Sequence, residues 1–511
     1  MTTWTSGYVA DVGYTYGYYN ELNPLRIQLA FLNAGLVYPQ VGAACELGFG
    51  QGLSTNIHAA ASVTQWVGTD FNPSQAGFAQ ELATASGSGA KLYDEAFADF
   101  ANRQDLPDFD FIGLHGIWSW ISDENRRVIV DFVRRKLKVG GVLYISYNTL
   151  PGWAAFAPMR HLMTEHADVL GAEGRGIVSR IDGALEFATK LLETNPLFSR
   201  ANPLVGDRLN GLRKHSRHYL AHEYFNRDWH PMHFATMAEW LEPAKVQFAC
   251  SAHYLDHLDV LNLTAEQQAF LKEIPDPMFR ESTRDFMVNQ QFRRDYWVRG
   301  ARRLPKPEQS ERLLEQSVVL VSHRPGLSLK VSGALGPAEM HDSVYSPILD
   351  VLADHKVKTL RQIERAVKDR GISLGQVVQA AMVLAGAGYA ALVAQETPAD
   401  SVKKATEKLN AHLCAKARGS GEVAFLASPT TAGGVTANQF EQLFILSIGA
   451  GKREPADWAK ETWAVVAAQG QKLLKEGKPI ETAEDNIAEL TAQATTFAKK
   501  RLPILNALQV V

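Results

Sequence analysis

Short apolar runs alternate with segments of helical length over the first third of the chain. Four of these runs predict buried strands: residues 43–47, 65–69, 109–114 and 142–146. Strands separated by helix-length segments are typical of parallel crossover connections, which predicts an α/β sheet wound by helices on both faces. A helix is expected before the first strand, over residues 23–35, because Asn23 can cap its start and Gly35 can end it.

The segment ELGFGQG, residues 46–52, follows the first predicted strand directly and precedes the helix-like run LSTNIHAAA. Such sheets bind ligands at the carboxyl ends of their strands, so three glycines there indicate a ligand close to the backbone. A dinucleotide fingerprint needs glycine at its first, third and sixth positions, but the sixth position here is Leu53. S-Adenosylmethionine has no phosphate and carries a positive sulfonium, which favours a nearby carboxylate such as Glu46.

Two acidic residues further along favour S-adenosylmethionine over a nicotinamide dinucleotide and over a purely structural loop. Asp70, at the end of the second strand, can accept hydrogen bonds from both ribose hydroxyls because a carboxylate has two oxygens. Asp99, in EAFADF, can accept a hydrogen bond from the adenine amino group, and Phe100 can pack on the ring. The donor-binding residues predicted in this way are Glu46, Gly48, Phe49, Gly50, Gln51, Gly52, Asp70, Phe71, Asp99 and Phe100.

These residues resemble the class I S-adenosylmethionine-dependent methyltransferases, whose fold is Rossmann-like. A narrower resemblance, to prokaryotic methyltransferases that carry a methyltransferase regulatory domain, covers nearly the whole chain. It rests on five runs: YTYGYYNELNP, ACELGFGQGLSTNIHAAA, SYNTLPGW, YLAHEYFNRDWHPMHF and RDFMVNQQFRRDYWVRG. Members of that family include rickettsial protein lysine methyltransferases that act on outer-membrane proteins. The resemblance implies an S-adenosylmethionine donor, S-adenosylhomocysteine as its product and, less specifically, a lysine acceptor.

The resemblance also implies one pocket built from the aromatic N-terminal segment, the glycine loop, the SYNTLPGW turn and the fourth strand end, IGLHGIWSW. On this basis the expected catalytic residues are Tyr147, His115 and Tyr18. Tyr16 and His115 join the expected donor-binding set. The expected acceptor-binding residues are Tyr14, Trp118, Asn148 and Trp153.

The chemistry of a lysine acceptor fits such a pocket. A lysine must be neutral to attack a methyl group although its free pKa is about 10.4, so its site must disfavour the ammonium or remove its proton. The faces of Tyr and Trp rings attract a sulfonium and a methylated ammonium. Tyrosine hydroxyls and His115 can accept or relay the proton. Ordinary core packing is the alternative interpretation for each of these aromatic residues.

Composition excludes several other classes. A chain of 511 residues with 46% hydrophobic and 21% charged residues predicts a soluble protein of several domains. A net charge of −3 gives no general attraction to nucleic acid or anionic membranes. The three cysteines form no pair motif and the start lacks a signal peptide, which suits a reducing cytoplasm. The histidines of residues 215–233 form no HExxH motif, so no metal site is expected.

Five parts are expected along the chain. They are an S-adenosylmethionine-binding methyltransferase domain over 1–160, a helical connector over 161–214, a methyltransferase regulatory domain over 215–315, a winged-helix-like domain over 316–395 and a mainly helical C-terminal domain over 396–511. The predicted helix after Ser373 lacks Lys and Arg as far as Ala385, which argues against nucleic-acid binding. The run 377–394 is rich in Ala and Gly and predicts a helix, a turn and a buried strand rather than a membrane span.

The leading hypothesis is a cytoplasmic methyltransferase that modifies lysine side chains of a protein, with an outer-membrane or surface protein as a candidate substrate and a homodimer as a candidate assembly. A second hypothesis keeps the donor but replaces the acceptor with a small molecule or another side chain. A third is a donor-binding regulatory protein without turnover, because more than half of the chain lies outside the predicted donor domain.

Overall fold

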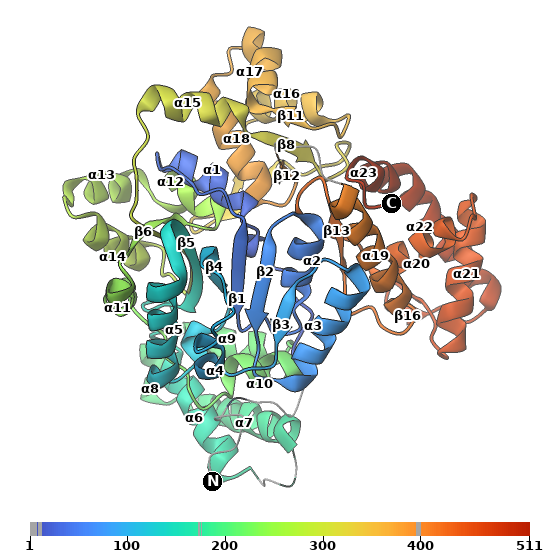
Figure 1. Cartoon of the computed structure of the whole chain (residues 1–511). Coiled ribbons are helices and arrows are strands. Elements are labelled where there is room, and N and C mark those ends of the chain that lie inside the picture. Colours follow the sequence, from blue (N-terminus) through green and yellow to red (C-terminus); the bar gives the residue numbers. More distant parts are fainter. Residues whose placement is uncertain (1–7, 9–12, 172–173, 175, 395–399) are drawn as a thin grey trace.

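The computed structural model describes residues 8, 13–171, 174, 176–394 and 400–511. A seven-stranded sheet lies at its centre, in the order β3-β2-β1-β4-β5-β7-β6 (Figure 1). The strands are β1 (Ala43–Leu47), β2 (Gln65–Thr69), β3 (Lys91–Tyr93), β4 (Phe109–Leu114), β5 (Leu137–Asn148), β6 (Val246–Ser251) and β7 (Phe292–Arg299). Strands β1 to β5 are parallel, and β7 is antiparallel to both β5 and β6.

Helices cover both faces of this sheet, because its parallel strands carry apolar side chains on alternate faces. Ala44 and Phe111 face a core shared with α1 and α2, whereas Cys45 and Ile112 face a core shared with α4, α5 and α11. These helices are α1 (Leu25–Asn33), α2 (Leu53–Ala61), α4 (Phe97–Ala101), α5 (Asp123–Lys136) and α11 (Phe234–Leu241), with α3 (Pro73–Ser86) beside α2. The prediction of a doubly wound α/β sheet is confirmed.

The sheet does not end near residue 160. Its last two strands, β6 and β7, come from the region expected to form a separate regulatory domain, and β7 pairs with β5 from Val142 to Asn148. Helices join these strands: α6 (Ala157–Val169), α7 (Gly176–Glu193), α8 (Leu197–Ala201), α9 (Leu204–Leu212) and α10 (Arg217–Tyr224) before β6, and α12 (Asp259–Asn262), α13 (Ala265–Glu273) and α14 (Pro277–Met287) before β7. The central fold unit therefore extends at least to Arg299.

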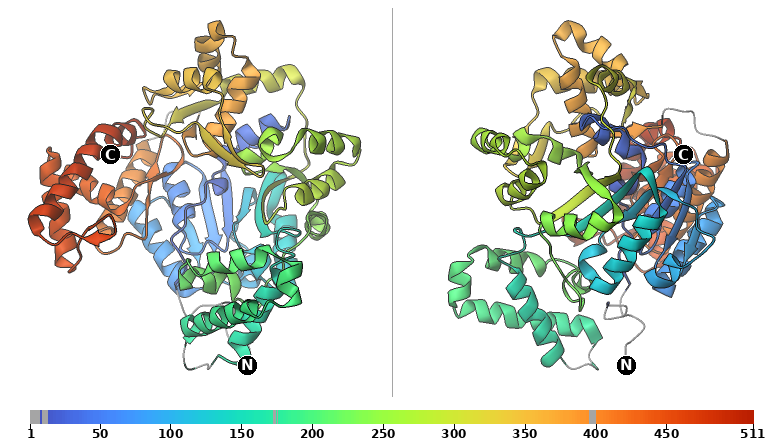
Figure 2. Two further views of the ribbon diagram at one scale, coloured as in Figure 1. Left: turned by 180° about the vertical axis from the view of Figure 1, so that it is seen from behind. Right: turned by 60° about the vertical axis from the view of Figure 1, so that its left-hand side comes forward.

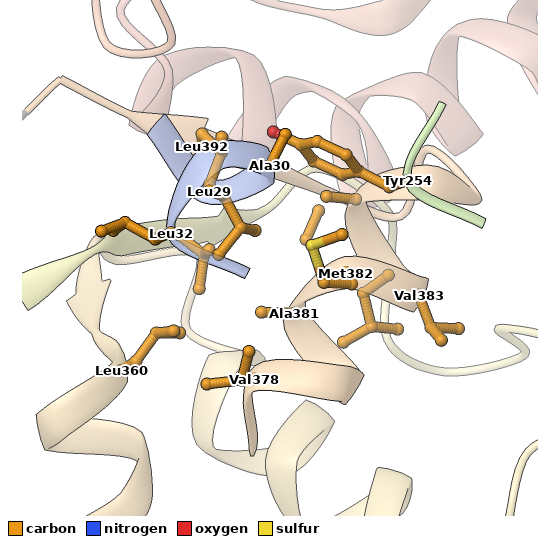
Figure 3. Packing of buried hydrophobic residues seen from close by; sticks show 14 of the residues in the cluster. Leu29, Ala30, Leu32, Tyr254, Leu360, Val378, Ala381, Met382, Val383 and Leu392 are labelled. Atoms are coloured by element: carbon orange, nitrogen blue, oxygen red, sulfur yellow. The ribbon is translucent and has the colours of Figure 1, made fainter. Parts of the chain in front are cut away.

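Residues 306–393 form a smaller α/β unit that shares a core with α1. Its strands are ordered β11-β8-β12. Its elements are α15 (Lys306–Glu315), β8 (Ser317–Leu320), α16 (Asp342–Leu352), β11 (Lys358–Thr359), α17 (Leu360–Val367), α18 (Leu374–Gly386) and β12 (Ala390–Val393), with a hairpin of β9 (Lys330–Gly333) and β10 (Gly336–Glu339). Figure 3 shows Leu29 and Leu32 of α1 among Val378, Ala381 and Met382 of α18. Because these side chains of α18 are buried, this helix cannot enter a nucleic-acid groove.

The C-terminal part packs beside α2 and α3 through α19 (Figures 1 and 2). It is mainly helical, with α19 (Asp400–Lys416), α20 (Gln439–Gly449), α21 (Pro455–Ala468), α22 (Ala483–Lys500) and α23 (Leu502–Ala507) and the short strands β13 (Phe425–Ser428), β14 (Gly433–Thr436), β15 (Leu474–Lys475) and β16 (Lys478–Pro479). Within the described ranges, no helix has both the length and the apolar character required to cross a bilayer.

Candidate functional site

The loop between β1 and α2 requires its three glycines. Gly48, Gly50 and Gly52 have φ angles of +72°, +57° and +66°, in the left-handed region that other residues rarely adopt. Space is also short, because a Cβ added to Gly48 would lie 2.5 Å from the side chain of Ile117. At Gly50 the nearest atom to such a Cβ is a ring carbon of Tyr14, 3.5 Å away. The backbone therefore turns tightly and leaves one open side.

Two carboxylates lie at the strand ends beside this loop. The N–H groups of Gly50 and Asn72 donate to the two oxygens of Asp70 at 2.8 and 3.0 Å, which ties the loop to the end of β2. Burial raises the pKa of Asp70 to about 6. Glu46 accepts a hydrogen bond from the Thr55 hydroxyl, and burial raises its pKa to about 8. A positive charge nearby would lower the pKa of both groups, because it stabilises the ionised forms that burial disfavours.

A cavity of about 160 Å³ opens above the loop. It is lined by Tyr8, Tyr14, Tyr19, Glu46, Gly48, Phe49, Gly50, Asp70, Phe71, Gln75, Glu95, Ala96, Phe97, His115, Gly116, Ile117, Trp120, Ile121, Ser122, Asn125 and Asp228. Seven of these residues are aromatic and four are acidic, whereas none of the described lining residues is Lys or Arg. This wall suits an apolar ring and a cation, and it lacks the usual partners of a phosphate.

His115 lines the cavity and contacts both Tyr19 of the N-terminal segment and Tyr144 of β5. It follows β4, and its ring stacks on Tyr19 with centroids 3.7 Å apart. Its Nδ1 lies 2.7 Å from the Tyr144 hydroxyl in a hydrogen bond. Burial lowers the pKa of His115 to about 4, so the imidazole is neutral at physiological pH.

Helix α10 covers the same cavity from outside the sheet. The His222 ring lies 5.5 Å from that of Tyr8 and 5.0 Å from that of Tyr14. The indole N–H of Trp120 donates to the carbonyl of Glu223 at 3.5 Å. Figure 1 shows α10 beyond the strand arrowheads, at the end of the sheet where the glycine loop lies.

Known proteins share this architecture and sequence. A family described as "Predicted methyltransferase regulatory domain" matches residues 216–299. The protein sll1526 of Synechocystis sp. is 41% identical, over 99% of this chain and 100% of its own length. PKMT2 from Rickettsia typhi, solved in complex with AdoHcy, superposes with a TM-score of 0.70 over 98% of this chain and 100% of its own. Its sequence is 17% identical, so the likeness shows a common fold. The chain belongs to the class I S-adenosylmethionine-dependent methyltransferases with a regulatory domain.

Ten of the eighteen predicted site residues lie in the glycine loop or in the wall of the cavity. Eight of them line the cavity: Tyr14, Glu46, Gly48, Phe49, Gly50, Asp70, Phe71 and His115. Gln51 and Gly52 complete the loop beneath it, where the Gln51 amide donates to the Tyr14 carbonyl at 3.3 Å. Gly52 precedes α2 as its N-terminal cap.

Asp99 and Phe100 lie away from the cavity. Asp99 is exposed on α4. Phe100 is buried beneath the sheet, where its ring centroid lies 5.6 Å from that of Phe132. The short helix turns both side chains away from the cavity, and Ala96 and Phe97 form the wall instead.

Tyr16 and Tyr18 also point elsewhere. Tyr16 packs edge-on against Phe78 of α3, with centroids 4.9 Å apart. The Tyr18 hydroxyl accepts a hydrogen bond from the Gly434 N–H at 2.7 Å and lies 3.1 Å from His58 Nε2. Both tyrosines therefore hold the N-terminal segment against α3 and the C-terminal part, and Tyr19 takes the place expected for Tyr18.

The three residues expected to bind the acceptor beside Tyr14 do not line the cavity. Trp118 is fully buried and donates its indole N–H to the Met232 sulfur at 3.3 Å. The Asn148 backbone N–H donates to Ser119 Oγ at 2.8 Å. The Trp153 indole donates to the Gln291 carbonyl at 3.0 Å.

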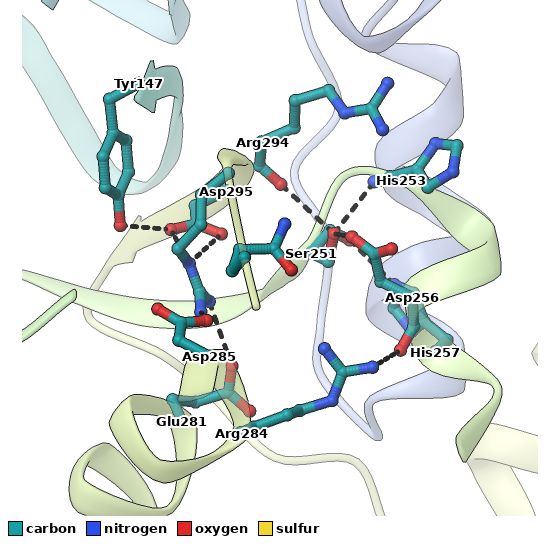
Figure 4. A network of polar contacts seen from close by, with 12 residues as sticks. Tyr147, Ser251, His253, Asp256, His257, Glu281, Arg284, Asp285, Arg294 and Asp295 are labelled. Carbon is teal, nitrogen blue, oxygen red and sulfur yellow. Dashed lines mark hydrogen bonds and ion pairs between the residues drawn. The ribbon is translucent and has the colours of Figure 1, made fainter. Parts of the chain in front are cut away.

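Tyr147 faces a buried ionic network on the far side of β5. Its hydroxyl donates to Asp295 Oδ2 at 2.9 Å (Figure 4). Arg293 contacts Asp295, Asp285 and Glu281 at 2.9, 2.6 and 3.0 Å. A separate cavity of about 350 Å³ adjoins this network between β6, β7 and α14. Tyr147 does not line the methyltransferase cavity, because its position in β5 directs the ring toward β7.

Replacing Tyr147 with Phe is therefore expected to lower stability rather than turnover. The loss of one hydrogen bond to a charged group should reduce the free energy of unfolding by about 1–3 kcal/mol. Affinity for the donor should stay within about twofold. Urea unfolding and calorimetry measure the two effects. A rate loss above about tenfold at unchanged stability would contradict this position for Tyr147.

The sequence analysis did not assign the other thirteen residues that line the cavity to the site. These residues are Tyr8, Tyr19, Gln75, Glu95, Ala96, Phe97, Gly116, Ile117, Trp120, Ile121, Ser122, Asn125 and Asp228. Several of these residues directly follow a strand end or a residue that was predicted. They could have been found only by assigning each whole loop after a strand to the site. Asp228 carried no local signal, because it reaches the cavity through tertiary packing. Within the described part of the chain, no group of three or more His, Cys, Asp or Glu side chains could hold a metal ion.

Donor binding is expected to strengthen as the pH rises from about 6 to about 8. Glu46 and Asp70 bind protons in this range, and a cationic ligand favours their ionised forms. One linked proton gives up to about a tenfold gain in affinity per pH unit. Calorimetry on the native protein and on Glu46→Gln measures the slope. An identical slope in the variant would exclude Glu46 as the linked group, since titration of the donor itself is common to both proteins.

Proposed function

We propose that this methyltransferase transfers the methyl group of S-adenosylmethionine to lysine side chains of a protein in the cytoplasm. The observation that carries the proposal is a pair of buried carboxylates that line the cavity and have no ion-pair partner among the described residues: Glu46 and Asp70. Burying an ionised carboxylate without a cationic partner is unfavourable in free energy. A cationic ligand would offset that penalty.

Donor and acceptor together supply such positive charges. S-Adenosylmethionine carries a sulfonium, an ammonium and a carboxylate and is therefore a cation overall, and its adenosine suits the aromatic part of the cavity. Lysine enters as a second ammonium. The rings of Tyr8, Tyr14 and Tyr19 offer π faces to these cations. PKMT2 of Rickettsia typhi, whose fold this chain shares, supports the choice of a protein lysine as the acceptor.

In-line methyl transfer needs alignment and exclusion of water more than acid–base power. The loop and the strand ends line the cavity, and His222 of α10 packs on Tyr14 in its wall, which supports that requirement. A small-molecule amine would meet the same chemistry and remains the second candidate, because the cavity wall recognises the amine and not what is attached to it.

Incubation of the full chain with methyl-labelled donor and a whole bacterial lysate tests the proposal. Protein is precipitated and hydrolysed in acid, and the labelled amino acids are separated. We expect label in methyl-lysine. Label confined to the small-molecule fraction would replace the proposed acceptor, and the absence of any donor-dependent label would refute turnover.

A further inference from the structure

The N-terminal tyrosines contact two different parts of the protein. Tyr14 and Tyr19 line the donor cavity. Tyr16 packs against α3, and the buried Tyr18 contacts the C-terminal part of the chain. The tyrosine segment, residues 14–19, therefore forms a wall of the cavity with some of its side chains and is attached to the rest of the protein through the others.

The hairpin of β13 and β14 holds Tyr18. The Tyr18 hydroxyl accepts a hydrogen bond from the Gly434 N–H at 2.7 Å, and its ring centroid lies 5.2 Å from that of Phe425. Close by, Asn23 Nδ2 donates to the Thr431 carbonyl at 3.3 Å. Figure 1 shows β13 beside α2. The C-terminal part thus reaches across the sequence to the segment that precedes α1.

The Tyr18 side chain occupies space that only glycine leaves free in β14. A Cβ added at Gly434 would lie 2.8 Å from Tyr18 Cζ, and one added at Gly433 would lie 2.6 Å from the hydroxyl. Neither glycine has a φ in the left-handed region, so the backbone itself would accept alanine. On the other side, the hydroxyl lies 3.1 Å from His58 Nε2 of α2. An added methyl group at Gly434 would therefore displace the Tyr18 ring.

Tyr19 connects this contact with the cavity. Its N–H donates to Ser54 Oγ at 2.9 Å, and its ring stacks on His115 with centroids 3.7 Å apart. The ring also lies against the backbone of Gly17, where an added Cβ would be 2.5 Å from the Tyr19 hydroxyl. Because the peptide bond between Tyr18 and Tyr19 is planar and rigid, a displacement of Tyr18 also moves the backbone of Tyr19.

Helix α19 attaches the C-terminal part to α3 independently of the hairpin. Glu81 of α3 lies 2.8 Å from Lys416 Nζ and 2.9 Å from His412 Nε2. Lys416 Nζ also lies 5.1 Å from the ring centroid of Phe78, against which Tyr16 packs. The part of the chain that holds Tyr18 is therefore itself fixed to the methyltransferase sheet through α3.

We propose that the C-terminal part of the chain positions the aromatic wall of the donor cavity, with Tyr18 as the positioning residue. Tyr18 does not line the cavity. Its contact with Gly434 fixes the backbone that places the Tyr19 ring on His115, beside the donor. The C-terminal part thereby contributes to the affinity for S-adenosylmethionine. This role is independent of the acceptor, so it does not rest on the proposed methylation of lysine.

Four variants of the full chain test this inference: Gly434→Ala, Tyr18→Ala, the two combined and, as a control, Gly449→Ala. Gly449 ends α20 in the same part of the chain, is exposed, and a Cβ added there meets no atom within 4 Å. Calorimetry measures the affinity for S-adenosylmethionine, and circular dichroism measures thermal unfolding. A purely structural contact would lower the unfolding midpoint and leave the affinity of the folded protein unchanged.

Gly434→Ala and Tyr18→Ala should each lower the donor affinity by about tenfold, on the scale of a disturbed packing contact. The midpoint of Gly434→Ala should stay within about 3 °C of the native value, and the control should match the native protein. Since Gly434 acts through the Tyr18 ring, the combined variant should bind the donor within about twofold of Tyr18→Ala alone.

Native affinity in either single variant would overturn the inference, as would a combined loss equal to the product of the two single losses. If Gly434→Ala does not unfold cooperatively, Tyr18→Phe takes its place, because it removes the hydroxyl contact and adds no atom. It should lower the donor affinity by about threefold, the scale of one hydrogen bond. Native affinity in that variant would likewise overturn the inference.

Discussion

A chain that ends at residue 160 is expected to be unable to fold. It would lack β7, which pairs with β5 over seven residues from Val142 to Asn148. It would also lack Tyr296 and Trp297, which are fully buried against the two faces of the sheet. Tyr144 and Tyr147 of β5 would lose their cover, and the unpaired strand edge would favour aggregation.

Circular dichroism during thermal unfolding measures this outcome: the truncated chain should show no cooperative transition. Co-expression with a second polypeptide of residues 161–511 is the control, because it restores β6 and β7 without restoring the peptide bond. Recovery of a cooperative complex would attribute the loss to the missing strands. A soluble, cooperatively unfolding chain of residues 1–160 that binds the donor would contradict the continuity of the sheet.

Replacing Gly50 with Val is expected to abolish measurable donor binding, with a loss of at least about 100-fold. The residue has a φ of +57°, which a β-branched side chain tolerates poorly. Its N–H donates to Asp70, so a shift of the backbone would also move that carboxylate. The added side chain would point toward Tyr14, into the space in which the donor must lie.

Gly77→Val is the matched control for this change. Gly77 is exposed on α3, and a Cβ added there meets no atom within 4 Å. Calorimetry with S-adenosylmethionine should therefore give native affinity for the control and no detectable heat for the loop variant. Equal affinities would show that the open side of the loop does not face the donor.

Strands β1, β2 and β4 were predictable because they are short, mainly apolar and covered by helices on both faces of the sheet. The observed bounds of β1, β2 and β4 match the predicted runs 43–47, 65–69 and 109–114, and the glycine loop follows β1 as expected. The pairing of β7 with β5 was not predictable, since 143 residues separate Asn148 from Phe292 (292 − 148 − 1) and no local pattern links them.

Side-chain direction was harder to predict than position. The segment from Tyr14 to Tyr19 has neither helical nor strand hydrogen bonding, so no period shows which tyrosines share a face. Tyr147 illustrates a different limit: a side chain at the end of a buried strand can face either side of the sheet. The contact of His222 with Tyr14 was also not predictable, because it depends on how α10 folds back over the strand ends.

Calorimetric titration of the full chain with S-adenosylmethionine and, separately, with NAD⁺ tests the central claim most directly. The cavity combines aromatic rings and carboxylates, and none of its described lining residues is Lys or Arg. Saturable binding of S-adenosylmethionine at one site per chain is predicted, with no binding of NAD⁺. Binding of NAD⁺ at the same site, or no binding of S-adenosylmethionine, would contradict the account.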